Sequence, residues 1–309
     1  MKRLLIGISL VLVVAIVGMG ASYQQGQKSL LDIDDNVRAS FPGDFAELDD
    51  GVISYYDRGP KFGDVVVLVH GLSTPKSVFS NNVDHLVNAG FRVIAYDHYG
   101  RGYSDRPEIA YDTDLYTREL QNLLDVLSVN DPVTLVGNSM GAANVISFAA
   151  KFPSRVKKLI LIAPAGLEPK PPLLPLVTLP GLGEWLAGRS FGSPNPGYGE
   201  PLTSSSAVVF ADNYMQQFLY KGYAASILST LRNGVVHERW DDYGAVGRLG
   251  IPVFALWGTA DTTSPFSGSE KLRELISAVE LLPIADAGHS IVYSKAATVN
   301  RMLLDILSR

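Results

Sequence analysis

The 309-residue sequence contains no cysteine. A chain without thiols forms no disulfide framework and no Cys-ligated zinc or iron–sulfur site, and it offers no cysteine for a lipoprotein's acyl chain. Charge is also scarce, because 18% of the residues are charged and 26 basic side chains stand against 31 acidic ones. The net charge of −5 gives no electrostatic reason to expect a nucleic acid partner. With 47% apolar residues, the composition excludes a disordered chain and indicates a folded protein with a large core.

Charge is missing altogether from one long stretch near the N-terminus. After Lys2 and Arg3, the residues from Leu4 to Ala21 carry no charge and are apolar on every side. As a helix, these 18 residues would measure about 27 Å, close to the thickness of the hydrocarbon core of a membrane. We therefore predict that residues 1–21 are a membrane anchor or a signal segment, and the length favours a retained single anchor.

The charges that flank this segment predict its orientation. Lys2 and Arg3 precede the apolar run, whereas the acidic residues Asp32, Asp34 and Asp35 follow it. The positive-inside rule then puts everything after the segment outside the cytoplasm. We expect a membrane-anchored protein whose folded part is periplasmic or extracellular, or a secreted protein if the segment is cleaved.

Short apolar runs rich in β-branched residues alternate with helical windows in the rest of the chain. The runs lie at 65–69, 91–95, 133–136, 159–162 and 251–257, and the helical windows at 78–89, 113–129, 142–152 and 268–278. Continuous apolar runs suit parallel strands that are buried on both faces. The alternation predicts an α/β protein with a parallel sheet and right-handed crossovers.

The alternation stops between residues 164 and 250. Nine of the 18 prolines fall between Pro164 and Pro201, which excludes a long helix there, and a helical pattern returns at 205–231. Long insertions at strand ends of such sheets commonly cover the site. We predict the following organisation: a linker at 22–44, a core made of 45–163 and 251–309, and a cap or lid at 164–250.

The sequence Gly-Asn-Ser-Met-Gly at 137–141 stands between a predicted strand and a predicted helix. Small residues at both ends permit a turn tight enough to expose the side chain of Ser139. The N–H groups at the start of the helix would then point at an oxyanion formed beside this serine. A serine is a poor nucleophile until a base takes its proton, so a histidine and a carboxylate are expected later in the chain.

Of the five histidines, His289 is the one that follows a late apolar run and precedes the last helical stretch. Asp261 comes just after the strand predicted at 251–257. A serine, an acid and a histidine in this chain order are expected for a strand-turn-helix nucleophile of this kind. Asp286 and Asp212 are alternative acids, and Asp261 could instead cap a turn.

These motifs, taken in order, resemble the α/β-hydrolase family over residues 45–309. His70-Gly71-Leu72 is similar to the family's oxyanion loop, and residues 97–104 (DHYGRGYS) are similar to its D-x-x-G-x-G-x-S turn. The resemblance implies an eight-stranded, mostly parallel sheet flanked by helices, with a helical cap. It gives His70 and Asp97 structural roles, and it leaves open whether Arg101 pairs with a carboxylate or is solvated.

The resemblance also implies the roles of the site residues. Ser139 would be the nucleophile, His289 the general base and then the general acid, and Asp261 the group that orients His289. The backbone amides of Leu72 and Met140 would form the oxyanion hole. Neither a metal nor an organic cofactor is implied.

The identity of the nucleophile narrows the chemistry. Related haloalkane dehalogenases and epoxide hydrolases place an aspartate there, whereas a serine suits attack on an acyl carbon. Apolar and aromatic residues of the insertion, at 173–177 and 208–223, could line the top of a substrate pocket, although they could equally be the core of the cap itself. With the anchor, they predict a serine esterase or lipase that cleaves a lipid-like or medium-chain carboxylic ester. The chain also resembles membrane-anchored acylglycerol lipases.

Three alternatives remain. Residues 137–141 and 164–167 also resemble carbon–carbon bond hydrolases of aromatic ring cleavage, although those enzymes usually carry a Trp after the catalytic histidine, where this chain has Ser290. A proline-type aminopeptidase is less favoured, because Met140 replaces the Trp usual after its nucleophile. A binding module without turnover is disfavoured because every triad position is filled.

Overall fold

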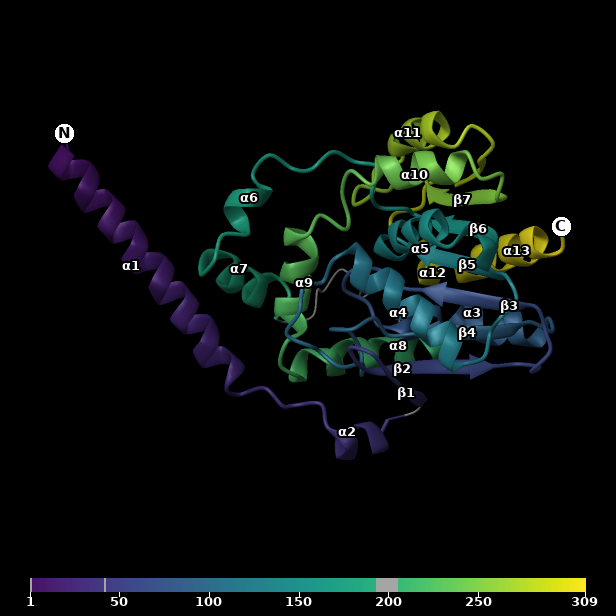
Figure 1. Ribbon diagram of the computed structural model, residues 1–309, viewed down its shortest axis with the longest axis horizontal. Helices are drawn as coiled ribbons and strands as arrows, with labels where there is room; N and C mark the ends of the chain where they lie inside the picture. The colour runs from purple at the N-terminus through teal and green to yellow at the C-terminus, as the bar shows by residue number, and fades with distance from the viewer. Residues whose placement is uncertain (1, 42, 193–204) are drawn as a thin grey trace.

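The structure, a computed structural model, describes residues 2–41, 43–192 and 205–309. A single eight-stranded sheet runs through the centre of these residues, with the strand order β1-β2-β4-β3-β5-β6-β7-β8 (Figure 1). The first two pairs in this order are antiparallel, and all the others are parallel. The strands are β1 (Asp44–Leu48), β2 (Gly51–Arg58), β3 (Val65–Val69), β4 (Arg92–Tyr96), β5 (Val133–Asn138), β6 (Val156–Ile162), β7 (Val253–Gly258) and β8 (Glu280–Ile284). The predicted α/β fold with a mostly parallel sheet is confirmed.

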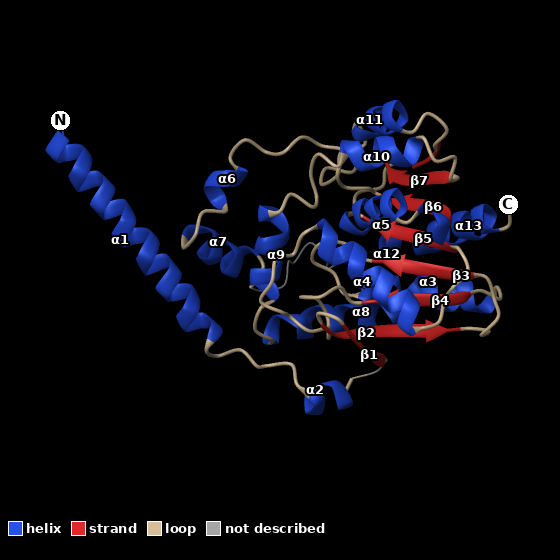
Figure 2. Cartoon of the chain, viewed as in Figure 1, coloured by secondary structure: helices blue, strands red, loops and turns tan. Residues whose placement is uncertain are grey.

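Helices cover both faces of the sheet, which is why its central strands are apolar without interruption (Figure 2). Alternate residues of β3 enter different core clusters: Val67 and Val69 face one side, Val66 and Leu68 the other. One face is covered by α4 (Thr113–Val126), α5 (Met140–Lys151), α10 (Trp240–Gly247) and α11 (Gly268–Leu275). The opposite face is covered by α3 (Ser80–Asn88), α12 (Ile291–Ser294) and α13 (Ala296–Leu307).

The cap lies between β6 and β7, where the insertion was predicted. It contains α6 (Leu174–Val177), α7 (Leu182–Ser190), α8 (Ser205–Gln216) and α9 (Tyr223–Arg232), and residues 193–204 of the predicted insertion lie outside the described residues. Within the same insertion, α10 packs against α5 and α11 on the face of the sheet. The described part of the insertion is therefore a cap followed by one helix that belongs spatially to the core.

The aromatic residues of α8 and its surroundings do not form the expected pocket roof. Phe210, Tyr214, Phe218 and Tyr223 are buried in the core cluster beneath α3, and their rings contact one another in sequence. This is because α8 lies against α3 and the short 3-10 helix η1 (Lys76–Phe79), so its apolar face is turned into the core. These contacts are those of the cap's own packing, and none of the four residues lines the cavity beside Ser139, although Phe218 and Tyr223 also line a second cavity next to α1.

The N-terminal segment is a single helix, α1 (Lys2–Gln27), which extends six residues into the predicted linker. Its portion from Ser9 to Gln27 is long and apolar enough to cross a membrane, and it is not buried in the protein. The linker is docked rather than free, because the N–H of Leu31 donates to Leu219 O at 2.8 Å and Phe41 stacks on Tyr103. It also holds the short helix α2 (Asp35–Ala39).

Candidate active site

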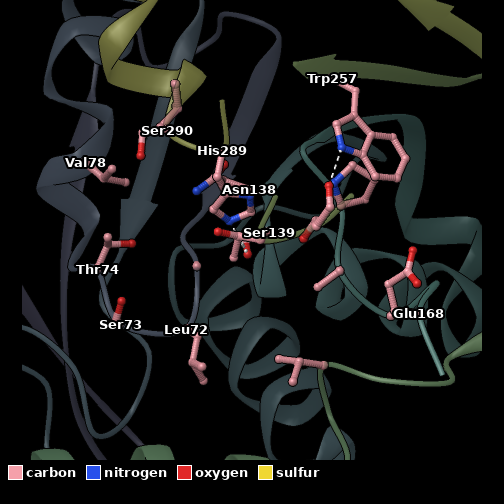
Figure 3. Close-up of a pocket in the computed structure, with 18 of the residues that line it drawn as sticks. Leu72, Ser73, Thr74, Val78, Asn138, Ser139, Glu168, Trp257, His289 and Ser290 are labelled. Carbon is pink, nitrogen blue, oxygen red and sulfur yellow. Dashed lines mark hydrogen bonds between the residues drawn. The ribbon is translucent and has the colours of Figure 1, made fainter. Parts of the chain in front are cut away.

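Three predicted side chains meet at the carboxyl edge of the sheet. Ser139 follows β5, Asp261 follows β7 and His289 follows β8, and the ends of neighbouring parallel strands share one edge. Ser139 Oγ lies 3.0 Å from Nε2 of His289, and His289 Nδ1 lies 2.8 Å from Oδ2 of Asp261 (Figure 3). The alternative acids, Asp286 and Asp212, are exposed. The structure therefore joins Asp261, and neither alternative, to His289.

Ser139 occupies a strained turn that only small neighbours permit. Its backbone has φ 54° and ψ −117°, an uncommon conformation for a residue with a side chain. A Cβ atom on Gly141 would lie 2.0 Å from Val69 O, and one on Gly137 would lie 2.5 Å from the Cα of Ala142. The two glycines of the motif are therefore required by close packing of β5, α5 and β3. Their absence of side chains lets the turn present Ser139 to the cavity.

The carboxylate of Asp261 is held from both sides. Its Oδ1 accepts the N–H groups of Thr263 at 2.8 Å and Ser264 at 2.9 Å, which leaves Oδ2 for His289. A carboxylate accepts a proton-bearing Nδ1, so the lone pair of the imidazole is left on Nε2, facing Ser139. This chain of hydrogen bonds is the arrangement that activates a serine hydroxyl for attack on a carbonyl.

The loop that carries the predicted oxyanion donor is oriented by His70. Nδ1 of His70 lies 2.8 Å from Gly71 O, and the N–H of His98 donates to the other ring nitrogen, so the proton is on Nδ1. The carbonyl and the N–H of a trans peptide point in opposite directions, so this bond turns the Leu72 N–H away from His70. A Cβ on Gly71 would lie 3.4 Å from the Cβ of Ser139, which places this loop against the side chain of Ser139.

The second predicted donor is the N–H of Met140, which is the first residue of α5. The first N–H groups of a helix have no partner within the helix, and the helix dipole adds partial positive charge at this end. The Leu72 loop and the start of α5 thus flank Ser139 with N–H groups available for an anionic oxygen. The oxyanion role of these two amides stays a prediction.

Arg101 connects the loop at residues 70–72 to the cap. This side chain is fully buried; its Nε donates to Leu72 O at 2.9 Å, and one Nη donates to Thr230 Oγ1 of α9 at 2.9 Å. The guanidinium is therefore not solvated, nor does it pair with a carboxylate of the described residues. Spacing alone could not distinguish these cases, because its partners come from distant parts of the chain.

Buried polar groups support the turn at 97–104. Asp97 accepts from Lys76 Nζ at 2.8 Å and from the Lys76 N–H, and both side chains are almost fully buried, which agrees with the structural role expected for Asp97. Behind the nucleophile turn, His98 Nδ1 contacts the carboxyl of Glu119. Burial lowers the pKa of His98 well below its usual value and raises the pKa of Glu119 well above its own.

A cavity of about 490 Å³ opens onto Ser139 and His289 (Figure 3). Its described lining includes one carboxylate, Glu168, and a second imidazole, His237, but neither Lys nor Arg. Residues 193–204, outside the described part, contain no Lys or Arg in their sequence either. Burial lowers the pKa of His237, so its ring is neutral near pH 7. The cavity therefore carries negative rather than positive charge.

Sequence reasoning missed Glu168 and His237. The available signal was that Glu168 follows the carboxyl end of β6, at the same edge as the nucleophile. Asn138 also lines the cavity; it is 6% exposed, and its Oδ1 has no hydrogen-bond partner among the described residues. Its side chain lies beside His289 in Figure 3. No cluster of three or more His, Asp or Glu side chains fit to hold a metal is found within the described residues.

A family model and several known proteins match most of this chain. The family model described as serine aminopeptidase, S33, matches residues 61–295. A 2-hydroxy-6-oxononadienedioate/2-hydroxy-6-oxononatrienedioate hydrolase 1 from Dechloromonas aromatica is 31% identical over 260 residues, which cover 79% of this chain and 87% of that protein. A hydrolase named for the same two compounds, from Klebsiella pneumoniae, is 28% identical over 273 residues, covering 80% of this chain and 88% of that protein.

A solved structure of similar shape is that of bromoperoxidase from Bacillus anthracis. It superposes with a TM-score of 0.69 at 24% identity, and the match covers 87% of this chain and all of that one. At this level of identity, the similarity is evidence for the fold alone. The family model, in contrast, matches most of the chain. The chain belongs to the family described as serine aminopeptidase, S33, and it is a serine hydrolase-like protein with the α/β-hydrolase fold.

Proposed function

We propose that this protein is a serine hydrolase that cleaves an uncharged carboxylic ester, lipid-like or medium-chain, through an acyl-enzyme. The observation that carries the proposal is the hydrogen-bonded series Ser139, His289 and Asp261, which opens into a cavity whose described lining contains Glu168 and neither Lys nor Arg. A negatively charged cavity disfavours substrates with a carboxylate close to the reacting carbonyl. Neutral esters meet no such penalty.

The residues divide the reaction as follows. Ser139 Oγ attacks the ester carbonyl while His289 Nε2 takes the hydroxyl proton, and Asp261 stabilises the resulting imidazolium. The N–H groups of Leu72 and Met140 stabilise the tetrahedral oxyanion. His289 then gives its proton to the leaving alcohol, and a water molecule, deprotonated by the same imidazole, hydrolyses the acyl-Ser139 ester.

We further propose that α1 holds the enzyme at a membrane, with the folded part outside the cytoplasm. Support comes from the apolar, unburied stretch Ser9–Gln27 and from the order of flanking charges, basic before and acidic after. A signal peptidase that removed this segment would release the enzyme instead. An ester that partitions into the bilayer would then be available at the site of the enzyme.

Carbon–carbon bond hydrolysis is a second candidate, and the relatives favour it over ester cleavage. Both of the relatives described above are named for hydrolysis of oxo-dienedioates or trienedioates, which are dicarboxylates. The unpartnered Oδ1 of Asn138, next to the nucleophile, could accept a hydrogen bond from a hydroxyl group of such a compound. The charge of the cavity favours the neutral ester, because the described lining offers a dicarboxylate neither Lys nor Arg.

One substrate panel separates the candidates. The full chain in detergent is assayed with p-nitrophenyl esters from acetate to palmitate and with 2-hydroxy-6-oxo-6-phenylhexa-2,4-dienoate, beside Ser139→Ala and His289→Ala. We expect ester turnover that falls at least about a thousandfold in both variants. Turnover of the dienoate alone would favour the second candidate. A fluorophosphonate that fails to label Ser139 in folded protein would leave only a binding module.

A further inference from the structure

Helix α1 packs directly on the cap, through glycine. Gly181, with φ +82° at the start of α7, lies against α1 so closely that a Cβ would be 2.6 Å from Ile16 Cγ2. Gly20 of α1 faces Gly181, and Gly188 faces the ring of Tyr23. Small residues are what allow helix backbones to approach this closely. Figure 1 shows α6 and α7 on the side of the molecule that faces α1.

The part of the cap next to this contact is apolar and exposed. Residues 171–183, which we call the cap tip, include no charged side chain. Leu173 and Leu176 are 66% and 54% exposed, and Val177 and Leu179 are each 40% exposed. Exposed apolar residues gathered in one segment of a folded protein are typical of a site that contacts a membrane or another protein.

The position of the contact along α1 gives the depth of the cap tip. Residues 22–27 of α1 (SYQQGQ) are mostly polar, so the apolar part of the stretch Ser9–Gln27 ends at Ala21. Ile16 stands five residues before that end, or about 7.5 Å along the helix. Interfacial segments bury their apolar face by about 5–10 Å at the boundary between headgroups and acyl chains. If α1 spans the bilayer, its contact with Gly181 therefore brings the cap tip to that boundary.

The residues that flank the cap tip suit the same boundary. Lys170 precedes it, and Trp185 and Arg189 follow it, with the guanidinium of Arg189 4.4 Å from the centre of the Trp185 ring. Tryptophan concentrates at membrane–water interfaces, and basic side chains there attract anionic headgroups. Glu184, which stands between the cap tip and Trp185, is paired with Arg232 at 2.8 Å, so its negative charge is balanced within the cap.

We propose that the cap tip docks on the bilayer that α1 enters, so that α1 and the cap form one lipid-contacting surface. This inference rests on the proposed anchoring by α1 and not on the ester chemistry. The occupant of the apolar surface is the outer leaflet of the membrane. Leu173, Leu176, Val177 and Leu179 enter it, while Lys170 and Arg189 remain at headgroup level.

The docked surface would lead toward the catalytic cavity. A second cavity, of about 320 Å³, lies where Tyr23 of α1 meets Trp185 of α7 and Tyr223 of α9. Phe191 lines both this cavity and the one that holds Ser139. An acyl chain that moved from the second cavity to Ser139 would therefore pass the ring of Phe191.

The absence of cysteine makes the test direct, because each single-cysteine variant has one labelling site. The variants Leu176→Cys in the cap tip, Val13→Cys in α1 and Phe62→Cys are labelled with a nitrobenzoxadiazole dye. Phe62 is 96% exposed and lies in the loop between β2 and β3. Figure 1 shows this loop at the end of the sheet away from α6. The full chain is reconstituted into phosphatidylcholine–phosphatidylglycerol vesicles with or without doxyl-labelled lipid.

We expect doxyl lipid to quench the dyes at positions 13 and 176 at least about threefold more than the dye at 62, and aqueous iodide to do the reverse. Quenching at 13 with free iodide access at 176 would overturn the docking and leave the anchor. Iodide access at both would overturn docking and anchor together. Shielding at 176 without doxyl quenching would mean that protein covers the cap tip, and would also overturn the proposal.

A kinetic arm tests the consequence for substrate uptake. Leu176→Asp with Val177→Asp is expected to slow hydrolysis of an ester embedded in vesicles at least about fivefold while leaving a water-soluble short ester within twofold. Phe62→Asp is the matched control and should change neither rate. If the double variant and the wild type hydrolysed the embedded ester at the same rate, uptake from the leaflet would be contradicted. If the protein cleaves no ester at all, the dye measurement still decides the docking.

Discussion

The main-chain N–H of His98 donates to Nε2 of His70 at 2.9 Å. This bond joins the turn at 97–104 to the oxyanion loop, two motifs that the sequence shows only as separate patterns. Because Nε2 accepts this bond, the proton of His70 is on Nδ1, which donates to the carbonyl of Gly71. That second bond sets the direction of the Leu72 N–H. Protonation of Nε2 would destroy the acceptor, so the loop needs a neutral His70.

The stability of the protein should therefore fall in mild acid. Burial lowers the pKa of His70 well below its usual value, so the unfolded chain binds a proton near pH 6.5 and the folded chain does not. The stabilisation from a neutral His70 is present above that pH and is lost as the pH falls, at up to about 1.4 kcal/mol per pH unit. We expect the thermal midpoint to decrease from pH 7.5 to pH 5, and to decrease less steeply in His70→Gln.

The control for this pH series is His85→Gln, because His85 is exposed and should leave the wild-type slope unchanged. Glu119 contributes with the opposite sign, since its pKa is raised by burial, but it is present in every variant and cancels in the comparison. Equal slopes in wild type and His70→Gln would show that His70 is not the buried neutral base that the geometry requires.

Asp261→Asn should reduce kcat about ten-thousandfold with little change in KM. An amide in this position favours the wrong tautomer of His289, so Nε2 would carry a proton and could not accept one from Ser139. Asp286→Asn is the matched control, because Asp286 is the exposed alternative acid and should keep wild-type kinetics. The measurement is steady-state ester hydrolysis. A larger loss in Asp286→Asn than in Asp261→Asn would contradict the assignment.

Glu168→Gln should change selectivity by charge rather than overall rate. Removing the carboxylate relieves repulsion of an anionic acyl group, and about 1 kcal/mol of relief corresponds to roughly a fivefold gain in kcat/KM. We expect this gain for a p-nitrophenyl hemisuccinate relative to the neutral p-nitrophenyl valerate. Glu108→Gln makes the same charge change at an exposed position outside the cavity and should give no gain. If the ratio of kcat/KM for the hemisuccinate to kcat/KM for the valerate were the same in both variants, Glu168 would not determine the selectivity of the site.

Phe191→Trp should slow the hydrolysis of long acyl esters selectively. Phe191 lines both cavities, so a larger ring narrows the passage that a palmitoyl chain would use and an acetyl group would not. We expect kcat/KM for p-nitrophenyl palmitate to fall at least about tenfold, a loss of ~1.4 kcal/mol in transition-state stabilisation, with acetate within twofold. Phe62→Trp serves as the control. A parallel loss for both esters would indicate general damage to the cap instead.

Much of the fold follows from local pattern. The run Val65 to Val69 is apolar at every position because helices cover both faces of the sheet, and this burial can be read without knowing the partners. The turn around Ser139 is equally local: a strand, a serine between two glycines and a helix leave few conformations for the chain. These features depend on neighbours in sequence. The order of Ser139, Asp261 and His289 could instead be predicted from the chain order expected for this kind of nucleophile turn, with Asp286 and Asp212 left as alternative acids.

The sequence by itself determined the parallel sheet, the nucleophile turn and the apolar N-terminal helix, because periodicity and sterics over a few residues dictate them. Only the tertiary structure decided that Asp261 rather than Asp286 reaches His289, that Arg101 joins Leu72 to Thr230, and that Gly181 packs on Ile16. Only the tertiary structure, again, made Glu168 the carboxylate of the cavity and turned the aromatic rings of α8 into the core. Each of these contacts joins side chains distant in sequence, and the direction of a side chain at the end of a loop is set by the packing around it.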